Sequence, residues 1–378
     1  MTTLERCEST LPATYYYDPA HHLRELEAIW YRSWLCAGRV QDVEDAGSYC
    51  VYRIGDQALI ITRDTEGRLH AFHNTCRHRG AELCAESRGR FSRERIVCPY
   101  HSWTYALNGD LLATPHRLPS ADFELARFGL YRVAVAAWAG FVFVNLEAAP
   151  AQGLEQSIGS GASTLAHWPL EQLTIVHRET HTLACNWKVF WENFSECYHC
   201  PRVHPELCQL VPMYGHAVVS AEDDPARGHG AGSSVSRSPL APGATTWTLD
   251  GSTRLPSFSE LTDEELLAGM TFVTLLPSMF IVAHVDYVRA VRMRPLGPEQ
   301  TELTIDWLLL PEVASSPEFD LERLVALGRL VVAQDGRVCE INQRGLRCRA
   351  HLAGVLVAQE HGVYELHRWV REQLAAHS

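Results

Sequence analysis

The sequence predicts an α+β protein, in which a small all-β domain precedes a larger unit made of an antiparallel sheet and long helices. Three observations support this fold class. Short β-rich runs separated by turn signals extend from about Gly47 to Leu146. Alternating apolar residues return at 270–310, and a long stripe of helical spacing follows from Ser316-Pro317. The chain of 378 residues is long enough for two domains.

The first elements are a helix and then the strands of the β domain. A helix is expected after Asp18-Pro19, because Asp18 can cap it, Pro19 suits its first turn and apolar residues then recur every three to four positions. The expected strands are 49–53, 58–63, 131–135 and 140–145, with turns at 64–67 and 108–109. The segment 148–164, rich in Ala, Gly, Ser and Gln, is typical of a linker. We therefore expect an N-terminal helical segment at 1–44 that packs on the C-terminal unit, a β domain at 45–150 and the C-terminal unit at 151–378.

The C-terminal unit is expected to open with a strand at 173–181 and a helix from about Trp187 to Cys200. The segment 221–245 is polar and rich in helix and strand breakers, so we expect a mobile loop there. Two or three strands follow around a hairpin turn at 295–300. In the long helix expected after Ser316-Pro317, one face carries a stripe formed by Leu321, Leu324, Gly328, Val331, Asp335 and Cys339.

The composition is that of a globular protein and excludes several function classes. A net charge of −12 argues against nucleic-acid binding and against docking on an anionic membrane. No run of about 18 or more apolar residues occurs, and residues 1–17 lack the pattern of a signal peptide, so we expect a cytoplasmic protein. In that compartment the 12 cysteines are expected to be metal ligands or buried thiols rather than disulfides.

Two Cys/His pairs in the β domain form the first candidate site. Cys76-Arg77-His78 is followed, after 19 intervening residues, by Cys98-Pro99-Tyr100-His101. Two thiolates and two imidazoles suit either tetrahedral zinc or a [2Fe–2S] cluster in which two histidines replace two cysteines on one iron. Each pair offers one Cys and one His, so each iron can take the same ligand type from both loops, whereas zinc fingers use Cys-Cys and His-His pairs. The spacing favours the cluster.

The stretch 186–205 holds the second candidate site. Glu196 and His199 are three residues apart and would share a helix face, while His199 and His204 would diverge by about 140° on an unbroken helix. Pro201 can disrupt the helix between the two histidines and bring them back together. Two neutral imidazoles and one carboxylate, with open positions left over, form the facial triad of mononuclear non-haem Fe(II) sites.

Asp335 is the best candidate for the third ligand, because it lies on the apolar stripe of the last helix, where an unpaired charge would be costly. Asp286 or Glu340 could take its place. Asn193 lies one helical turn before Glu196 and is expected to support the ligands from behind. Cys197 and Cys200 bracket His199, and we interpret this pair as filler rather than as a redox or zinc site.

These motifs resemble those of a known family. Cys76-Arg77-His78-Arg79-Gly80 and Cys98-Pro99-Tyr100-His101-Ser102-Trp103 are similar to the two signatures of Rieske ferredoxins and Rieske oxygenases. The stretch NFSECYHCPRVHP resembles the iron-binding stretch of the catalytic α subunits of Rieske non-haem iron oxygenases, the aromatic-ring-hydroxylating dioxygenase family, and Gln334-Asp335 falls where that family has its third ligand.

The resemblance implies a Rieske domain followed by a helix-grip catalytic domain. It assigns Cys76, His78, Cys98 and His101 to the [2Fe–2S] cluster, and His199, His204 and Asp335 to the mononuclear Fe(II). Glu196 would then link a cluster histidine of one subunit to an iron histidine of the next. Most members have Asp at this position, and Glu resembles the branch that acts on quaternary amines such as carnitine and betaines.

The expected activity is that of a terminal oxygenase in a homotrimer. It would use O2 and electrons from NAD(P)H, supplied by a separate reductase with a flavin or ferredoxin-type donor, because the chain has no convincing GxGxxG fingerprint. The expected reaction is hydroxylation or N-demethylation of a betaine-type amine, with dihydroxylation of an arene as the alternative. Aromatic residues that could form a cation–π cage or an arene slot are Trp191, Phe194, Tyr198, Trp247, Phe280, Tyr287 and Trp307. An alternative of another class is a Rieske electron-transfer protein without oxygenase activity.

Overall fold

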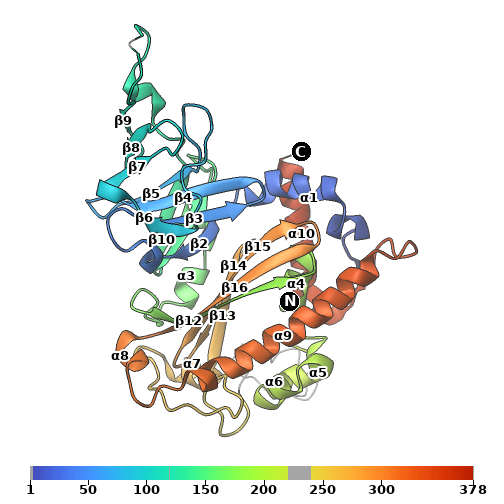
Figure 1. Ribbon diagram of the computed structural model, residues 1–378. Helices are drawn as coiled ribbons and strands as arrows, with labels where there is room; N and C mark the ends of the chain where they lie inside the picture. The colour runs from blue at the N-terminus through green and yellow to red at the C-terminus, as the bar shows by residue number, and fades with distance from the viewer. Residues whose placement is uncertain (1–2, 119, 220–239, 378) are drawn as a thin grey trace. The chain divides into compact units, whose positions relative to one another are not determined.

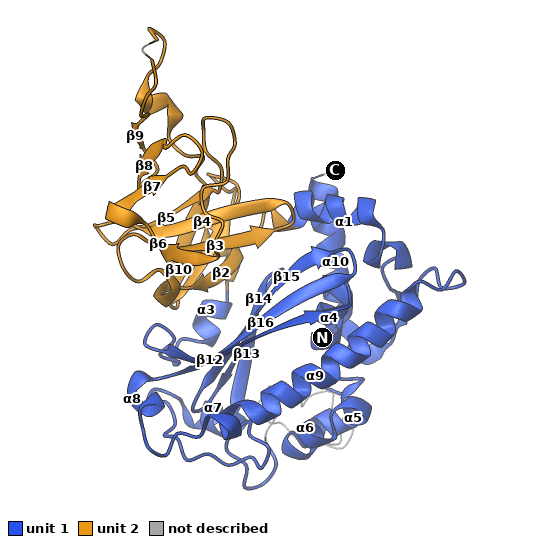
Figure 2. Cartoon of the chain, viewed as in Figure 1, with its two compact units in different colours: residues 1–29, 160–378 blue, residues 30–159 orange. Residues whose placement is uncertain are grey.

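The computed structural model describes residues 3–118, 120–219 and 240–377 (Figure 1). It divides into two compact units, coloured separately in Figure 2. Unit 1 combines Met1–Ile29 with Ser160–Ser378, and unit 2 is Trp30–Gly159. The predicted α+β class is confirmed, with small sheets in unit 2 and an antiparallel sheet flanked by long helices in unit 1.

Unit 2 consists of three small antiparallel sheets. The first has the order β5-β4-β3-β6 and contains β3 (Ser48–Ile54), β4 (Gln57–Arg63), β5 (Leu69–His73) and β6 (Arg88–Arg90). The second has the order β10-β11-β2 and contains β2 (Leu35–Arg39), β10 (Ala134–Trp138) and β11 (Phe141–Asn145). The third is β7 (Arg95–Val97), β8 (Thr104–Ala106) and β9 (Leu111–Ala113). The strands expected at 49–53, 58–63 and 140–145 are confirmed, while that expected at 131–135 begins three residues later, at Ala134.

The hairpin between β8 and β9 turns at Asn108-Gly109, as the sequence predicts. Gly109 has a φ of 87°, and a Cβ atom there would overlap the ring of Phe72. A residue with a side chain would therefore meet both backbone strain and a steric clash, because only glycine adopts this φ without cost. This turn holds β8 and β9 against the core that surrounds Cys76 and Cys98.

Unit 1 is built on a five-stranded antiparallel sheet of order β12-β16-β15-β14-β13. Its strands are β12 (Thr174–Leu183), β13 (Met270–Leu275), β14 (Met279–His284), β15 (Val288–Gly297) and β16 (Gln300–Leu309). The hairpin expected at 295–300 is confirmed, since Gly297 pairs with Gln300 where β15 turns into β16. A two-stranded pair of β1 (Glu8–Ser9) and β17 (Val355–Leu356) joins the two ends of the unit.

Helices cover the sheet of unit 1. The long helix α9 (Leu321–Leu346) runs across it and packs against β12 and α4 (Trp187–Phe194), and α4 packs against α10 (His361–Ala376) (Figure 1). The other α-helices among the described residues are α1 (Pro19–Glu25), α2 (Leu154–Ile158), α3 (Gly161–Thr164), α5 (Cys200–Val203), α6 (Pro205–Leu210), α7 (Asp263–Ala268) and α8 (Pro311–Ala314). Short 3-10 helices are Ala13–Tyr16, Val40–Val43, Ser92–Glu94, Leu125–Phe128, Pro212–His216 and Ala358–Glu360, and Leu26–Trp30 is a π-helix. Among the described helices, none has the length and apolar character needed to cross a bilayer.

The helix expected after Asp18 is confirmed, and the Asp18 carboxylate accepts a hydrogen bond from the Ala20 amide. Three other expectations differ from the structure. The segment expected to be a linker contains α2 and α3. The last long helix starts at Leu321 rather than near Ser316, because Asp320 caps it by accepting a hydrogen bond from the Arg323 amide. Most of the loop expected at 221–245 lies outside the described residues.

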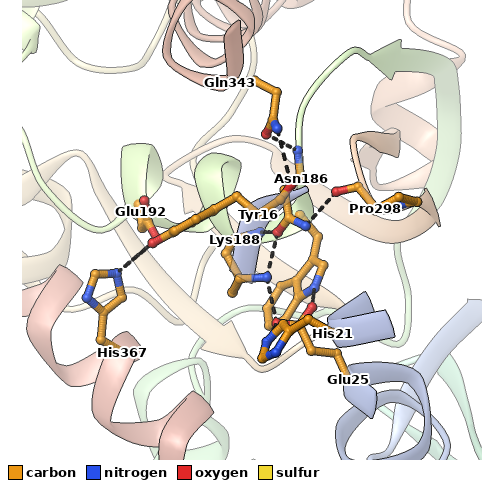
Figure 3. Close-up of polar contacts among 10 residues, drawn as sticks. Tyr16, His21, Glu25, Asn186, Lys188, Glu192, Pro298, Gln343 and His367 are labelled. Atoms are coloured by element: carbon orange, nitrogen blue, oxygen red, sulfur yellow. Dashed lines mark hydrogen bonds and ion pairs between the residues drawn. The ribbon is translucent and has the colours of Figure 1, made fainter. Parts of the chain in front are cut away.

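A buried polar network fastens the N-terminal segment to α4 (Figure 3). The Lys188 ammonium lies 2.6 Å from a Glu25 oxygen, and both side chains are fully buried. His21 also contacts Glu25, at 3.1 Å, and the Asn186 side chain accepts from Lys188 at 2.8 Å. Burial alone would raise the pKa of Glu25, but Lys188 and His21 hold that pKa below its usual range. An ionised pair therefore fixes the start of α4, the helix that leads into the candidate iron site.

Candidate functional site

Two breaks in the helical stretch position the histidines of unit 1. Helix α4 ends at Phe194, and the Ser195 hydroxyl donates to the Trp191 carbonyl at 2.6 Å. The helix expected to reach Cys200 is therefore shorter, and Glu196 lies after its end rather than on its face. His199 then caps α5, and His204 lies between α5 and α6. Pro201 lies in the first turn of α5, so the expectation that it breaks a helix between the histidines is wrong.

His199, His204 and Asp335 converge in space. One ligand atom from each residue lies within 4.8 Å of the other two. Asp335 Oδ1 is 2.8 Å from His204 Nε2 and 3.5 Å from His199 Nε2. Two imidazoles and one carboxylate facing a common point are the donor set of a mononuclear Fe(II) site with open positions. The residues present thus fit the metal.

The outer nitrogen of each imidazole is held by an acceptor. His199 Nδ1 lies 2.6 Å from Glu196 Oε1, and His204 Nδ1 lies 2.7 Å from Gln334 Oε1. Since these oxygens accept hydrogen bonds, each Nδ1 carries a proton and each Nε2 faces Asp335, where it can bind a metal ion once its own proton is lost. Metal-binding histidines are oriented in this way in proteins generally. Residue spacing did not indicate Gln334 as a partner of His204, because 130 residues separate the two in the sequence.

The charges at this point favour a cation. Burial by itself lowers the pKa of His199, but hydrogen bonds to Asp335 and Glu196 outweigh it and raise that pKa to about 9. Burial would raise the pKa of Asp335, yet its contacts with the two histidines lower it. Asp335 is therefore an ionised carboxylate, available to a metal ion.

The other predicted residues of this region have different places. Asn193 lies beside the histidines, with Nδ2 3.3 Å from His199 Nε2. Asp286 instead accepts from the Thr246 hydroxyl at 2.5 Å, and Glu340 accepts from the Ala184 amide at 3.0 Å. These two carboxylates, considered as alternatives to Asp335, are engaged elsewhere.

Cys197 and Cys200 form a disulfide, with their Cα atoms 5.0 Å apart. The expectation that the cysteines are metal ligands or buried thiols rather than disulfides is therefore wrong for this pair, which was interpreted as filler. The irregular backbone after α4 followed by the first turn of α5 brings the two buried thiols together. The disulfide brackets His199 in the chain and lines the cavity described next.

A cavity of about 110 Å³ adjoins the three converging side chains. Of the aromatic residues expected at a substrate site, Phe194, Trp247 and Phe280 line it. Trp191, Tyr287 and Trp307 are core residues, and Tyr198 is exposed, so these four do not line it. The lining residues that sequence reasoning missed include Phe190, Tyr214, Phe272 and Arg289. They come from α4, the 3-10 helix Pro212–His216, β13 and β15, and no local pattern shows that these segments meet.

The two Cys/His pairs of unit 2 also come together. Cys76 and Cys98 are buried, unpaired thiols, and the rings of His78 and His101 lie 4.7 Å apart. Each motif forms a tight turn, in which the Gly80 amide donates to the Cys76 carbonyl at 2.9 Å and the Ser102 amide donates to the Cys98 carbonyl at 3.0 Å. Both cysteines thereby project from loops onto a common point.

The environment of these side chains suits a [2Fe–2S] cluster. His101 Nδ1 is buried and has no hydrogen-bond partner among the described residues, as expected for a nitrogen that binds a metal. Burial raises the pKa of the Cys76 thiol, and the Tyr105 hydroxyl 3.2 Å from its sulfur partly opposes that rise. Trp103 stacks on His78 with ring centroids 4.8 Å apart and shields one side. Two thiols and two imidazoles that converge in this way match the donor set of a Rieske centre.

Comparisons with known proteins decide the family. The model of the ring hydroxylating alpha subunit (catalytic domain) matches residues 170–376, and that of the Rieske [2Fe-2S] domain matches residues 33–128. The chain belongs to the Rieske oxygenase α subunits. It is therefore an oxidoreductase, the terminal oxygenase component of a system of this family, with a Rieske [2Fe–2S] cluster and a non-haem iron. An oxygenase subunit of this kind implies a reductase partner.

Two curated relatives match along nearly the whole chain. The oxygenase subunit of glycine betaine monooxygenase from Chromohalobacter salexigens is 30% identical, with 97% of this chain and 86% of the relative covered. The chloroplastic choline monooxygenase of Spinacia oleracea is 26% identical, with coverage of 97% and 78%.

Solved structures share the fold. The quaternary ammonium Rieske monooxygenase CntA in complex with L-carnitine has a TM-score of 0.71 at 21% identity, with coverage of 97% of this chain and 96% of that one. Naphthalene 1,2-dioxygenase from Rhodococcus sp. has a TM-score of 0.74 at 20% identity, with coverage of 97% and 94%. Because proteins that act on such different compounds share it, the fold alone does not select the substrate.

Proposed function

We propose that this oxygenase hydroxylates an N-methyl group of a small quaternary ammonium compound. The observation that carries the proposal is the cavity at the His199, His204 and Asp335 cluster, which has aromatic side chains around a small volume. Aromatic faces attract a trimethylammonium cation through cation–π interactions, and this attraction strengthens where water is excluded. The relatives named for glycine betaine and choline support the same substrate class.

The proposed reaction balances as one C–H bond, O2, two electrons and two protons giving C–OH and water. The resulting N–CH2–OH group then loses its hydroxyl proton as the C–N bond breaks, which releases formaldehyde and a tertiary amine. When bound, the [2Fe–2S] cluster supplies electrons one at a time and Fe(II) activates O2.

We assign the ligands as the sequence predicts. Cys76, His78, Cys98 and His101 hold the cluster, and His199, His204 and Asp335 hold the iron. Glu196 and Gln334 keep both iron histidines in the tautomer that presents Nε2 to the metal. Asn193 lies beside His199 and supports its orientation. The aromatic lining excludes water from the point where the substrate meets the iron.

We further propose that Glu196 bridges to a cluster histidine of a neighbouring subunit in a homotrimer. Two observations support this role. Glu196 Oε1 contacts the outer nitrogen of His199, and Glu196 also lines a second, open cavity of about 660 Å³ with Glu192 and Glu360. In the same proposal the cluster domain spans 45–150 and the catalytic domain 151–378. Electrons come from NAD(P)H through a flavin-containing or ferredoxin-type reductase in the cytoplasm.

Substrate-dependent O2 uptake tests the proposed function. The purified chain, loaded with cluster and iron and supplied with a reductase, is given glycine betaine, choline, L-carnitine and naphthalene in turn. We expect uptake with at least one quaternary ammonium compound, with formaldehyde formed in step with O2 when an N-methyl group is oxidised. The His204→Ala variant is the control and should lose the uptake. A response to naphthalene alone would replace the proposal with arene dihydroxylation, and no response to any compound would favour a pure electron-transfer protein.

A further inference from the structure

Arg289 places a positive charge inside the cavity. It lies near the start of β15, where its backbone pairs with Val282 of β14 and Trp307 of β16. Its side chain lines the cavity together with Asp335 and Trp247, yet only 6% of the residue is exposed. This part of the cavity wall is therefore a buried guanidinium rather than an apolar group.

No carboxylate in the described part of the chain forms an ion pair with this guanidinium. It makes no hydrogen bond or ion pair with any described residue, and its Nε atom is buried without a partner. Two other arginines of the same strand are paired, Arg292 with Asp306 and Arg294 with Glu302. A buried charge without a partner is costly, so a structural role alone does not account for Arg289.

The absence of a side chain at Gly328 leaves room for the guanidinium. At Gly328 of α9, a Cβ atom would lie 2.8 Å from Arg289 Nη1 and 3.3 Å from Trp307 Cζ2. Burial lowers the pKa of Arg289, while Tyr287 and Asp335 act in the opposite direction. An arginine remains charged even so, because its intrinsic pKa is far above neutrality. The cavity thus presents a fixed cation beside the carboxylate of the candidate iron site.

We infer that Arg289 binds the carboxylate of the substrate, so the cavity selects a betaine over a quaternary ammonium alcohol. This inference rests on the proposed function and deepens it. A planar guanidinium binds a carboxylate through two parallel hydrogen bonds. The trimethylammonium end then lies against aromatic side chains of the lining, which include Phe194, Trp247 and Phe280.

Charge and size both limit the substrate. A zwitterion brings a carboxylate that neutralises Arg289, whereas choline brings only a cation that the buried guanidinium repels. The volume of about 110 Å³ favours a compact molecule, with a short link between nitrogen and carboxylate. Glycine betaine has both properties and is the probe for the test.

Equilibrium binding under anaerobic conditions tests the inference without turnover. Glycine betaine and choline are titrated by calorimetry into the wild-type oxygenase and into Arg289→Met. We expect Arg289→Met to weaken glycine betaine binding on the order of 10²-fold, because a buried charge pair loses one member. Choline binding should stay the same or become tighter. An equal loss for both ligands, or no loss for glycine betaine, would overturn the inference.

Two further measurements separate recognition from folding. Removing an unpaired buried charge should leave the melting temperature of the Arg289→Met protein without ligand equal to or above that of the wild type, and its iron content unchanged. A lower melting temperature would instead mean that Arg289 stabilises the fold. A loss of iron would mean that it positions Asp335.

A milder change keeps the charge and moves it. Gly328→Ala presses a methyl group on Arg289 Nη1 and should weaken glycine betaine binding more than choline binding. Gly345→Ala is the matched control, because this position of the same helix has open space around it. Equal effects of the two alanines would contradict the inference.

The titrations distinguish a failure of the inference about Arg289 from a failure of the proposed function. If the wild type binds glycine betaine and Arg289→Met binds it equally well, the inference fails and the proposed function stands. If the wild type binds neither compound, the proposed function fails together with the inference.

Discussion

Replacing Gln334 with leucine tests how the second histidine of the iron site is held. Gln334 Oε1 lies 2.7 Å from His204 Nδ1, and its amide nitrogen donates to Glu206 at 3.0 Å. Leucine fills a similar volume but accepts no hydrogen bond, so the His204 ring is free to rotate and to change tautomer. Loss of such an outer partner weakens metal binding by about 10- to 100-fold, which corresponds to about 1.4 to 2.7 kcal/mol.

The assay is an anaerobic Fe(II) titration against a competing chelator. The visible absorbance of the cluster is recorded in the same samples as an internal control. The absorbance should not change, because the cluster ligands belong to unit 2. Gln334→Glu keeps an acceptor and should bind iron nearly as well as the wild type. Asn342→Leu, at an exposed position of the same helix, is the matched control and should have no effect. Unchanged iron affinity in Gln334→Leu, or an equal loss in Asn342→Leu, would refute the reasoning.

Three other predictions concern the core, the bridge and the disulfide. Lys188→Met leaves the Glu25 carboxylate buried without its ammonium partner and should lower the free energy of unfolding by about 3 to 5 kcal/mol in urea at pH 7.5. This loss relative to the wild type should shrink toward pH 5, because the pKa of Glu25 rises in the variant and its protonated form is less costly to bury; a pH-independent loss would argue against it. Glu196→Gln should slow cluster oxidation in stopped-flow experiments while iron is retained, and an unchanged rate would exclude the bridging role. Thiol counting on the unfolded chain should give two more thiols with reductant than without it, a difference that Cys200→Ser should abolish; an equal count for the wild type would contradict the disulfide.

Residue spacing predicted the parts of the site that depend on local sequence. The Cys/His pairs at 76–78 and 98–101 lie in tight turns whose backbone hydrogen bonds span only a few residues. Asp335 was identified from the apolar stripe of α9, because a long helix keeps its periodicity whatever packs against it. The strands at 49–53, 58–63 and 140–145 and the hairpin at 295–300 were predicted correctly, because alternating apolar residues and turn residues are also local signals.

Contacts between distant segments set the features that the sequence did not predict. Helix α4 ends at Phe194 rather than at Cys200. The next residue, Ser195, donates a hydrogen bond back to the Trp191 carbonyl and lies against Gly362 of α10. The burial of Arg289 depends on the approach of α9 at Gly328, which a strand pattern does not encode. The Cys197–Cys200 disulfide likewise depends on the irregular backbone between α4 and α5.

Iron and acid-labile sulfide analysis of anaerobically purified protein tests the two-centre account most directly. The account predicts three irons and two sulfides per chain, because a [2Fe–2S] cluster and one mononuclear iron are both present. His199→Ala should contain two irons and two sulfides and keep the visible spectrum of the cluster. Two irons and two sulfides in the wild type, with no change in His199→Ala, would contradict the assignment of His199, His204 and Asp335 as an iron site.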